Sequence, residues 1–431
     1  QYACNENRLM LYKGFGEKTQ QNVLESIGFY IQSQGFFLYA QLEEIFPQID
    51  TYLKKLFSPE KVRVTGKYRR QELIIDELEF VIAEPNEVIK PKFKTAQPPE
   101  LLEETANNLL FKLKNGLKLR LYTGVTNRAQ TLFETTGSIE FIKTFHSAFP
   151  DLKFNGNETE EDEIIFRKAG IEYIPPCLRE SSEIIEIAKK QALPKLIQPE
   201  DIRSIIHCHS NWSDGSNTLE EMAAECIKRG YEYLVISDHS QTAGYANGLK
   251  EDRVKEQHKQ IDELNRQLAP FRIFKSIESD ILNDGSLDYP ESVLQTFDLV
   301  IASVHSNLKM TEEKAMARLT RAIENPYTRI LGHMTGRLLL SRNGYPVDHK
   351  KIIEACAANH VVIEINAHPR RLDMDWKWIS YAMEKKVLIS INPDAHFLEG
   401  FDDIKYGVLA AQKGCLTPKC NLSSFSLKEF D

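Results

Sequence analysis

The sequence predicts a multi-domain α/β protein with parallel strands in its C-terminal half. Its 431 residues are enough for roughly two or three domains. After residue 200, short β-branched apolar runs alternate with amphipathic stretches that have helical spacing. Repeated strand–helix units of this kind imply parallel strands, which form either an open sheet or a barrel.

Seven strands are expected in this C-terminal half, with helices between several of them. The predicted strands are 203–207, 233–237, 272–277, 298–303, 329–332, 361–365 and 387–392. The predicted helices are 219–230, 312–325 and 349–360. Before residue 200, short strands such as 78–83 and 117–122 mix with helices, and the Pro-rich stretch 84–100 is expected to be a loop.

Composition shifts divide the chain into four segments. Residues 1–57 are predicted to be helical around a Gly-containing turn, and 58–145 mix strands with helices. Residues 146–197 form a small module and linker, and the main boundary precedes a domain at 198–431. Because the first residue is Gln rather than Met, we expect the chain to begin inside a longer natural one.

Composition also restricts the class of protein. The 42% hydrophobic and 27% charged content is typical of a globular protein, and no apolar run reaches the length of a membrane span. The seven cysteines are scattered without a CxxC pair, which predicts a reducing, cytoplasmic location. The net charge of -8 argues against a uniformly basic nucleic-acid binder. The basic stretch 61–70 is either a solvated hairpin face or a local phosphate contact.

Potential metal ligands follow the predicted strands. In α/β barrels, function collects at the C-terminal ends of the strands. A lone histidine is more often structural, but the recurrence of His and carboxylate residues at most strand ends indicates a metal centre. Since side chains alternate along a strand, His207 and His209 should project to one side and Cys208 to the other. The strand-end residues are His207, His209, Asp214, Asp238, His239, Glu278, Asp280, His305, His333, Asn366, Asp394 and His396.

The number and type of these ligands limit the metal chemistry. They are too many for one tetrahedral zinc site. Imidazoles mixed with carboxylates suit about two or three divalent ions that share a bridging carboxylate, and Mn²⁺, Zn²⁺ and Fe²⁺ all remain open. Such clusters activate water and stabilise displacement at phosphorus.

The motifs HCHSNWSDG, SDHS, IESDILNDGSLDYP, ASVHS, LGHMTGRLL, EINAHPRRLD and PDAH occur in order between residues 207 and 396. In this order and spacing they resemble the PHP (polymerase and histidinol phosphatase) phosphoesterase family. The resemblance implies a distorted, TIM-like (β/α)7 barrel that binds up to three metal ions. One ion would take His207, His209, Glu278 and Asp394. Glu278 would bridge to a second ion held by His305 and His333, and a third would lie with Asp214, His239 and His396.

The same resemblance points to catalytic roles for Glu278, His305, Arg337 and Arg371. The two arginines resemble family positions near the site. A guanidinium fork suits phosphate, although a salt bridge to a neighbouring loop is an equal alternative.

The whole chain resembles bacterial family X DNA polymerases, in which a polymerase core precedes a PHP domain. The stretch GFGEKTQQNVLESI resembles a helix-hairpin-helix, which implies DNA contacts by Gly14, Gly16 and Lys18. The stretch YIPPCLRESSEIIEIAKKQALPKLI resembles the join into the PHP domain. The four segments would then be fingers-like, palm-like, thumb-like and PHP.

The palm-like segment departs from the family pattern of Gly-Ser-x-Arg-Arg followed by an Asp-x-Asp pair. In GKYRRQELIIDELEF, Arg69 and Arg70 are kept as expected DNA contacts, whereas Glu77 and Glu79 stand at the Asp positions. Arg120 stands near the third acid, where it reverses the charge that holds Mg²⁺. The polymerase site is therefore expected to be inactive or very weak.

These observations favour a metal-dependent DNA phosphoesterase of DNA repair. It would act as a 3′–5′ exonuclease, with 3′-phosphatase or abasic-site endonuclease activity as further options. Its partners would be single-stranded or primer-template DNA ends, with no membrane and no obligate protein partner. The alternatives are a histidinol-phosphatase-type phosphomonoesterase, a still-active family X polymerase, and a non-catalytic DNA-binding scaffold.

Overall fold

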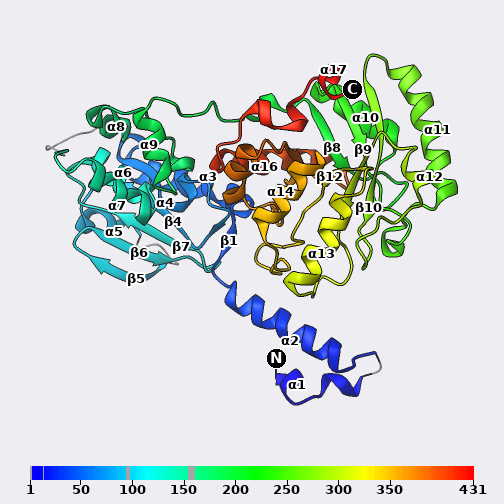
Figure 1. Cartoon of the computed structure of the whole chain (residues 1–431). Coiled ribbons are helices and arrows are strands. Elements are labelled where there is room, and N and C mark those ends of the chain that lie inside the picture. The colour runs from blue at the N-terminus through cyan, green and yellow to red at the C-terminus, as the bar shows by residue number, and fades with distance from the viewer. Residues whose placement is uncertain (1, 13, 94–97, 154–160) are drawn as a thin grey trace. The chain divides into compact units, whose positions relative to one another are not determined.

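The computed structural model describes residues 2–12, 14–93, 98–153 and 161–431. It divides into two compact units (Figure 1). Unit 1 comprises Gln1–Leu193 and Leu339–Arg342, and unit 2 comprises Pro194–Leu338 and Asn343–Asp431. The parts of the predictions for 84–100 and 146–197 that fall on 94–97 and 154–160 lie outside the described residues. None of the described helices combines the length and apolar character that a membrane span requires.

Unit 2 is a nearly closed barrel of seven parallel strands. Each predicted strand is found, within a few residues of its expected bounds, in the spatial order β14-β13-β12-β11-β10-β9-β8. A parallel bridge between Cys208 and Ala395 joins the two edge strands at their C-terminal ends, where His209 N donates to Ala395 O at 2.8 Å. The strands are β8 Ser204–Cys208, β9 Tyr233–Ile236, β10 Arg272–Asp280, β11 Leu299–Ser303, β12 Thr328–Leu331, β13 Val362–Asn366 and β14 Ile389–Asn392.

Helices lie around the outside of this barrel, as Figure 1 shows. The first of them, α10, starts at a capping box between Thr218 and Glu221 and ends at Gly230, whose φ of 83° is left-handed. The predicted helices 219–230, 312–325 and 349–360 all form. The helices are α10 Leu219–Arg229, α11 Glu251–Leu268, α12 Glu291–Leu294, α13 Glu312–Ile323, α14 His349–Asn359, α15 Ile379–Glu384, α16 Ile404–Lys413 and α17 Leu427–Phe430.

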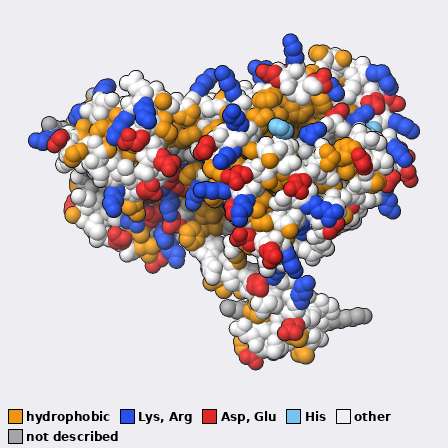
Figure 2. Space-filling model, in the orientation of Figure 1, with side chains coloured by type: hydrophobic (Ala, Val, Ile, Leu, Met, Phe, Trp, Pro, Cys, Tyr) orange, Lys and Arg blue, Asp and Glu red, His pale blue; other side chains and the backbone are white. Residues whose placement is uncertain are grey.

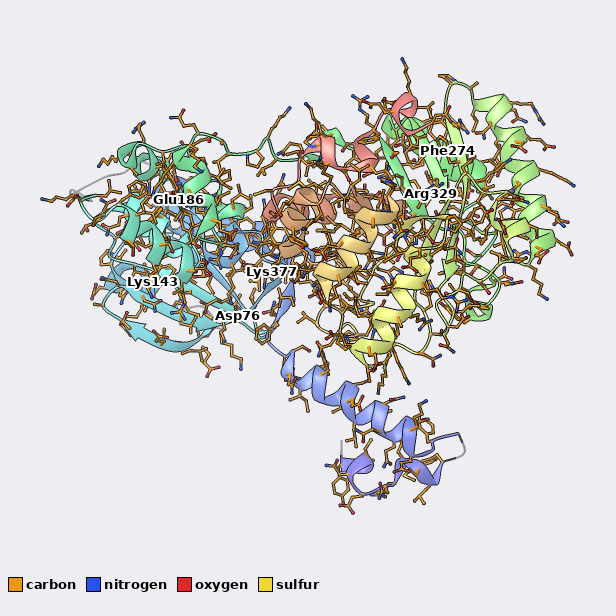
Figure 3. All side chains as sticks on the ribbon, in the orientation of Figure 1. Asp76, Lys143, Glu186, Phe274, Arg329 and Lys377 are labelled. Carbon is orange, nitrogen blue, oxygen red and sulfur yellow. The ribbon has the colours of Figure 1, made fainter. Side chains whose placement is uncertain are left out.

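The inside of the barrel is apolar at one end and charged at the other. Ile206, Val235 and Phe274 belong to a buried apolar cluster that the C-terminal residues Leu427 and Phe430 also contact. Phe274, labelled in Figure 3, lies on β10 four residues before Glu278. Because side chains alternate along a strand, the two share one face. The apolar cluster therefore fills the N-terminal end of the barrel and leaves the C-terminal end to Glu278.

Unit 1 contains a five-stranded sheet with the order β2-β4-β7-β6-β5, in which only β4 and β7 are parallel neighbours. The short strands β1 (Phe37–Leu38) and β3 (Ile74–Ile75) pair separately, so 1–57 is not wholly helical. The sheet strands are β2 Val62–Thr65, β4 Glu77–Ile82, β5 Glu100–Thr105, β6 Asn108–Lys112 and β7 Lys118–Tyr122. The helices are α1 Tyr2–Asn5, α2 Glu17–Gln32, α3 Tyr39–Phe57, α4 Gly66–Arg69, α5 Asn86–Lys92, α6 Arg128–Thr136, α7 Ile139–Ala148, α8 Glu163–Ala169 and α9 Glu183–Lys189.

The helix α5 corrects the prediction that 84–100 is a loop. Ile89 of this helix is fully buried in the core beneath the sheet, and Asn86 donates to Thr105 O at 2.7 Å. Burial of one apolar side chain and pairing of one buried amide thus stabilise a helical turn that the polar composition hides.

On the face shown in Figure 2, basic and acidic side chains are interspersed over each unit.

A buried charge cluster forms around Asp162 in unit 1. Arg179 Nη1 donates to Asp162 Oδ2 at 2.5 Å, and Arg69 donates to both carboxylate oxygens at 2.7 and 2.9 Å. The side chains of Asp162 and Arg179 have no exposed surface. Burial alone would raise the pKa of Asp162, but the two guanidinium groups outweigh it and lower the pKa to about 2 from the ordinary 3.8.

We expect Asp162→Asn to lower the free energy of unfolding of unit 1 by about 3 kcal/mol at neutral pH, because the buried Arg179 loses its charged partner. Since the folded pKa of Asp162 is depressed, its stabilisation is present above about pH 4 and is lost as the pH falls toward about 2. The substitution should therefore flatten the acid dependence of unfolding in that window.

Hydrogen exchange of peptides from β4 and α6 in the full chain measures this effect. Trp212, Trp376 and Trp378 all belong to unit 2, so their fluorescence reports that unit and should not change. Glu163→Gln removes an exposed neighbouring charge and should change stability by less than about 0.5 kcal/mol. If Asp162→Asn and Glu163→Gln changed hydrogen exchange equally, the pairing of Asp162 with Arg179 would be contradicted.

Candidate metal centre

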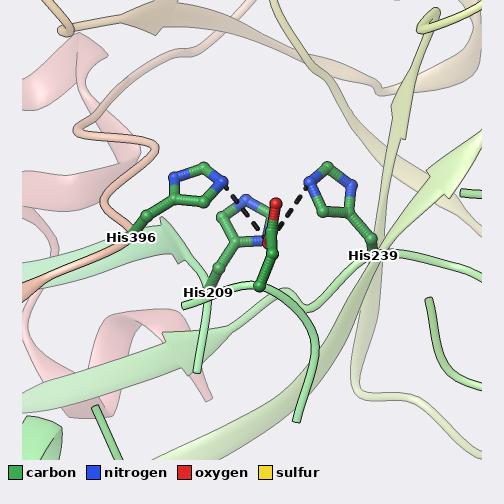
Figure 4. Close-up of side chains that lie close together, drawn as sticks. His209, His239 and His396 are labelled. Carbon is green, nitrogen blue, oxygen red and sulfur yellow. Dashed lines mark ion pairs between the residues drawn. The ribbon is translucent and has the colours of Figure 1, made fainter. Parts of the chain in front are cut away.

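The predicted ligands of unit 2 meet at the C-terminal end of the barrel. His207 lies on β8, Glu278 lies on β10, and His305 follows β11. Figure 4 shows the rings of His209, His239 and His396 converging on one point. The ring centroids of His209 and His396 are 4.2 Å apart, and those of His209 and His239 are 4.3 Å apart. Residues far apart in the sequence are thus placed together because parallel strands end at the same edge.

A bulge in β8 turns His207 into the barrel. Ile206 already faces the interior, so simple alternation would turn His207 outward. The register with β9 shifts between Ile206 and Cys208, and His207 adopts a left-handed φ of 61°. Cys208 then packs on the outer core, and His209 returns to the interior side, as predicted for this pair. The local irregularity therefore supplies two inward imidazoles from three consecutive residues.

Glu278 is the carboxylate around which the centre is arranged. It is only 1% exposed, and its two oxygens face different sets of histidines. Oε1 faces Nε2 of His207 (3.2 Å), His305 (3.2 Å) and His333 (2.9 Å), and Oε2 faces His209 Nε2 (3.7 Å) and His239 Nδ1 (3.0 Å). A carboxylate whose two oxygens face different sets of imidazoles is suited to bridging two cations.

Three groups of side chains have ligand atoms within 4.8 Å of one another. Glu278 belongs to two of these groups, and so do His209 and His239. The shared members make the three groups one contiguous centre. The groups are His207, His209, Glu278 and Asp394; His239, Glu278 and His305; and His209, Asp214, His239 and His396.

The second group differs from the sequence-based expectation. His239, rather than His333, joins Glu278 and His305. His333 still approaches Glu278 Oε1 at 2.9 Å, but it lies outside all three groups. The expected first group is brought together in full, and the third gains His209.

The donor set fits divalent cations. Among the described residues, the buried side-chain atoms that lie in ion-pair range at most, without a hydrogen bond of favourable geometry, include His207 Nε2, His209 Nδ1, His239 Nδ1 and Glu278 Oε2. Buried polar atoms are normally paired, so a concentration of unpaired ones at one place needs an explanation. Imidazole nitrogens and carboxylate oxygens are the ligands that first-row divalent ions take in proteins.

The electrostatics of the centre keep its carboxylate ionised and act differently on the separate imidazoles. Burial alone would raise the pKa of Glu278, but His305, His207 and His239 outweigh it, and the carboxyl pKa lies well below its ordinary range. Burial lowers the pKa of His209 well below its ordinary value, and His239 lowers it further. The pKa values of His207, His239 and His305 are raised instead, because Glu278 and its neighbouring carboxylates outweigh burial, so these imidazoles would release protons when they bind a metal.

Two carboxylates orient the histidines from behind, and the sequence did not assign them this role. Glu364 on β13 faces His207 Nδ1 at 2.6 Å and accepts from Asn392 Nδ2 at 2.8 Å. Asp280 faces His305 Nδ1 at 2.5 Å. Partners of this kind fix which ring nitrogen is turned toward a metal. The available signal for Glu364 was a lone carboxylate within the apolar strand VVIEI, since a buried charge needs a partner.

Asp238 is not a ligand, although it follows a strand. Its buried oxygens accept from Ser210 N at 2.8 Å, Ser213 Oγ at 2.5 Å and Gln257 Nε2 at 2.6 Å. Burial raises the pKa of this carboxyl despite these bonds. Asp238 thereby fixes the loop that carries both His209 and Asp214.

The two predicted catalytic arginines lie in different environments. Arg337 pairs with Asp375 at 2.6 Å and donates to Arg371 O at 3.0 Å, so the salt-bridge alternative holds for it. Arg371 Nε lies 3.5 Å from Asp394 Oδ2, with its side chain 21% exposed. Of the two guanidinium groups, that of Arg371 lies beside a carboxylate of the centre, and that of Arg337 is engaged with Asp375.

Each predicted polymerase-site residue of unit 1 has a partner within that unit. Arg120 binds Glu77 through Nε–Oε1 at 2.9 Å and Nη2–Oε2 at 3.3 Å. Glu79 accepts from Tyr122 Oη at 2.9 Å and from the backbone N of Lys67 at 3.1 Å. Burial raises the pKa of the Glu79 carboxyl. Asp76, labelled in Figure 3, binds Lys67 Nζ at 2.6 Å.

The predicted DNA contacts of unit 1 are placed as follows. Arg69 is engaged with Asp162, and Arg70, which is only 9% exposed, pairs with Glu180 at 3.0 Å. These internal partners give no support to phosphate binding by either side chain, which stays a prediction. Gly14, Gly16 and Lys18 are exposed at the start of α2, and their DNA contacts also stay predictions.

Residues 206–368 match the PHP domain family. With the seven-stranded parallel barrel and its ligand set, this match defines unit 2 as a PHP domain, and the chain is a metal-dependent hydrolase of the phosphoesterase class. The chain is also 34% identical to the DNA polymerase/3'-5' exonuclease PolX of Bacillus subtilis, over 100% of this chain and 78% of that protein. The chain therefore belongs to the PolX family.

Two further similarities each cover less than half of this chain. A probable phosphatase of Caldicellulosiruptor saccharolyticus is 28% identical over 204 residues, which is 44% of this chain and 79% of that protein. A crystal structure of histidinol phosphate phosphatase from Lactococcus lactis, with zinc, L-histidinol and phosphate, is 18% identical with a TM-score of 0.38. It covers 49% of this chain and 94% of that one.

We expect Glu364→Gln to weaken Mn²⁺ binding by about 10- to 100-fold, because His207 loses the carboxylate that fixes its ring. Titration calorimetry measures the affinity, and tryptophan fluorescence measures how far Mn²⁺ shifts the melting of unit 2. Glu354→Gln, an exposed change on α14, should bind Mn²⁺ like the wild type. An unchanged affinity in Glu364→Gln would contradict the orienting role.

Proposed function

We propose that unit 2 hydrolyses phosphodiester bonds at DNA ends, as a 3′–5′ exonuclease. The observation that carries the proposal is the buried centre of histidines and carboxylates around Glu278, in a chain that belongs to the PolX family. The relative from Bacillus subtilis is named as a polymerase and 3'-5' exonuclease, which supports DNA as the substrate.

The chemistry follows from what the donor set can hold. When bound, about two or three divalent ions would activate water and neutralise phosphate oxygens. Glu278 would bridge the first and second positions, and Asp214 would serve the third. The guanidinium of Arg371, beside Asp394 and partly exposed, is suited to receive a phosphate oxygen. Mn²⁺, Zn²⁺ and Fe²⁺ all accept this ligand set, so we propose the class of ion rather than one ion.

We expect His207→Ala to reduce Mn²⁺-dependent degradation of a single-stranded 3′ end by at least about 1,000-fold, because a fully buried ligand of the first group is lost. Degradation is followed on end-labelled oligonucleotides by gel, with a primer-template as the second substrate. A phosphomonoester in the same assay measures the competing phosphatase activity.

The control is His360→Asn. His360 is exposed at the C-terminus of α14 with a left-handed φ of 57°, which Asn tolerates. This variant should degrade DNA at the wild-type rate. Wild-type hydrolysis of the phosphomonoester without any DNA cleavage would replace the proposal by a small-molecule phosphatase.

We also propose that the palm-like segment no longer catalyses nucleotide transfer. Mg²⁺ in such a site needs unpaired carboxylates. Here the guanidinium of Arg120 binds Glu77, Lys67 binds Asp76, and a tyrosine hydroxyl binds Glu79. An arginine cannot lose its proton in the working range of pH, so its pair with Glu77 persists.

We expect the full chain to fill a one-nucleotide gap at less than about 0.01 per second, against a median near 10 per second for enzymes in general. The assay uses the His207→Ala variant, so that degradation of the primer does not hide extension. Its matched partner adds Glu77→Asp, Glu79→Asp and Arg120→Asp, which should gain Mg²⁺ binding in unit 1. Extension at several nucleotides per second without these changes would refute the inactive palm.

A further inference from the structure

The metal centre opens into a groove built from three loops at the C-terminal end of the barrel. A pocket of about 670 Å³ reaches from His305 and Asp280 to Tyr245, Asn283 and Asp284. A second hollow shares Asn283 and Asp284 and continues to Lys309 and Lys314. The two hollows adjoin one another, since these two residues line both. A path thus leads from the metal ligands outward along unit 2.

The walls of this groove are fixed by a buried arginine. Arg318 on α13 is only 3% exposed. Its Nε donates to Leu282 O at 2.9 Å, and its Nη1 donates to Ser306 O at 2.9 Å. One guanidinium therefore ties the loop after β10 to the loop after β11. A substrate that enters the groove meets walls that are already in place, which reduces the ordering cost of binding.

Tyr245 exposes its ring at the metal end of the groove. Among the described residues of unit 2, the exposed large hydrophobic side chains are Tyr245 (74%), Phe397 (51%) and Ile227 (43%). The Tyr245 ring centroid lies 6.2 Å from that of His239, and Phe397 directly follows the ligand His396. Two of the three therefore belong to loops that carry metal ligands. An exposed aromatic ring beside an active centre is placed to stack against a base.

The charges of the groove suit a polyanion despite its acidic residues. Asp280 is paired with His305 at 2.5 Å and accepts from Thr242 Oγ1 at 2.8 Å. Asp284 is paired with Arg321 at 2.9 Å. Lys309 and Lys314 expose their side chains along the outer part. An aromatic ring followed by cations is the arrangement with which proteins hold single-stranded nucleic acid.

We propose that this groove holds the unpaired end of a DNA strand, with a base beside the scissile phosphate stacked on Tyr245 and the following phosphates near Lys309 and Lys314. The inference rests on the proposed DNA phosphoesterase function and adds its specificity. The centre would then favour unpaired ends, because a base within a duplex is held by its pairing partner and its stacked neighbours and must leave them before it can stack on the ring in the groove.

The test is a cycle of two enzymes and three substrates. Wild type and Tyr245→Ala are compared on a single-stranded oligonucleotide, and on copies that carry an abasic nucleotide at the last or the next-to-last position. On the normal strand, Tyr245→Ala should lower kcat/KM about 10-fold, mainly through KM, because one stacking contact is lost. On one of the two abasic strands, the variant and the wild type should be equal.

Controls separate stacking from a structural effect. Tyr245→Phe keeps the ring and should restore the dependence on the base. Mn²⁺ binding should be equal in all three proteins. An equal loss on normal and abasic strands would overturn the inference, as would wild-type rates for Tyr245→Ala. If the wild type cleaves phosphomonoesters but no DNA, the proposed function fails as well, so the two failures can be told apart.

The cations are tested by salt dependence. Removing one phosphate contact should reduce the slope of log kcat/KM against log salt by about 0.7 for a single strand. Lys314→Gln should show this reduction. Lys228→Gln is the control, since Lys228 lies 75% exposed in the last turn of α10, at the opposite end of the barrel. Equal slopes for Lys314→Gln and Lys228→Gln would show that Lys314 makes no phosphate contact.

Discussion

Unit 2 depends on one buried carboxylate, that of Glu278. An ionised carboxylate with 1% exposure is costly by several kcal/mol unless it is paired. The imidazoles that face it come from β8 and from the loops after β9, β11 and β12. These partners lie on non-adjacent parts of the chain, so the charge is satisfied only when the barrel is formed. Closure of the sheet and assembly of the centre are therefore one requirement.

The backbone departs from regular geometry at the seam of the barrel, where the edge strands β8 and β14 meet. His207 on one edge and Asp394 after the other edge both have left-handed φ values, 61° and 52°. Such a conformation is unfavourable by about 1–2 kcal/mol for a residue with a side chain. The bridge between Cys208 and Ala395 joins the same two segments. The two ligands are thus aimed inward by distortions that the closed seam maintains, which is typical of functional sites.

The sequence predicts the strands and the ligand positions because both follow short, local patterns. Apolar runs mark the strands, and one or two potential ligands directly follow each. The grouping of His239 rather than His333 with His305 could not be predicted, since it depends on the distances between imidazole nitrogens at the ends of different strands. That choice is set by strand stagger, a long-range property. The partners of Arg69 were hidden for the same reason, because Asp162 lies 93 residues away.

Both units contain a cluster of partly or fully buried carboxylates. The basic side chains that pair with these carboxylates differ between the two units. In unit 2 the partners are imidazoles, which can lose a proton and coordinate a cation that the carboxylates also attract. In unit 1 the partner of Glu77 is Arg120, which keeps its charge and occupies the position itself. A permanently charged partner pairs with the carboxylate where an ion would otherwise bind, which is the basis of our proposal that unit 1 no longer catalyses nucleotide transfer. The chemistry that each unit can perform is thus decided by the bases around its acids.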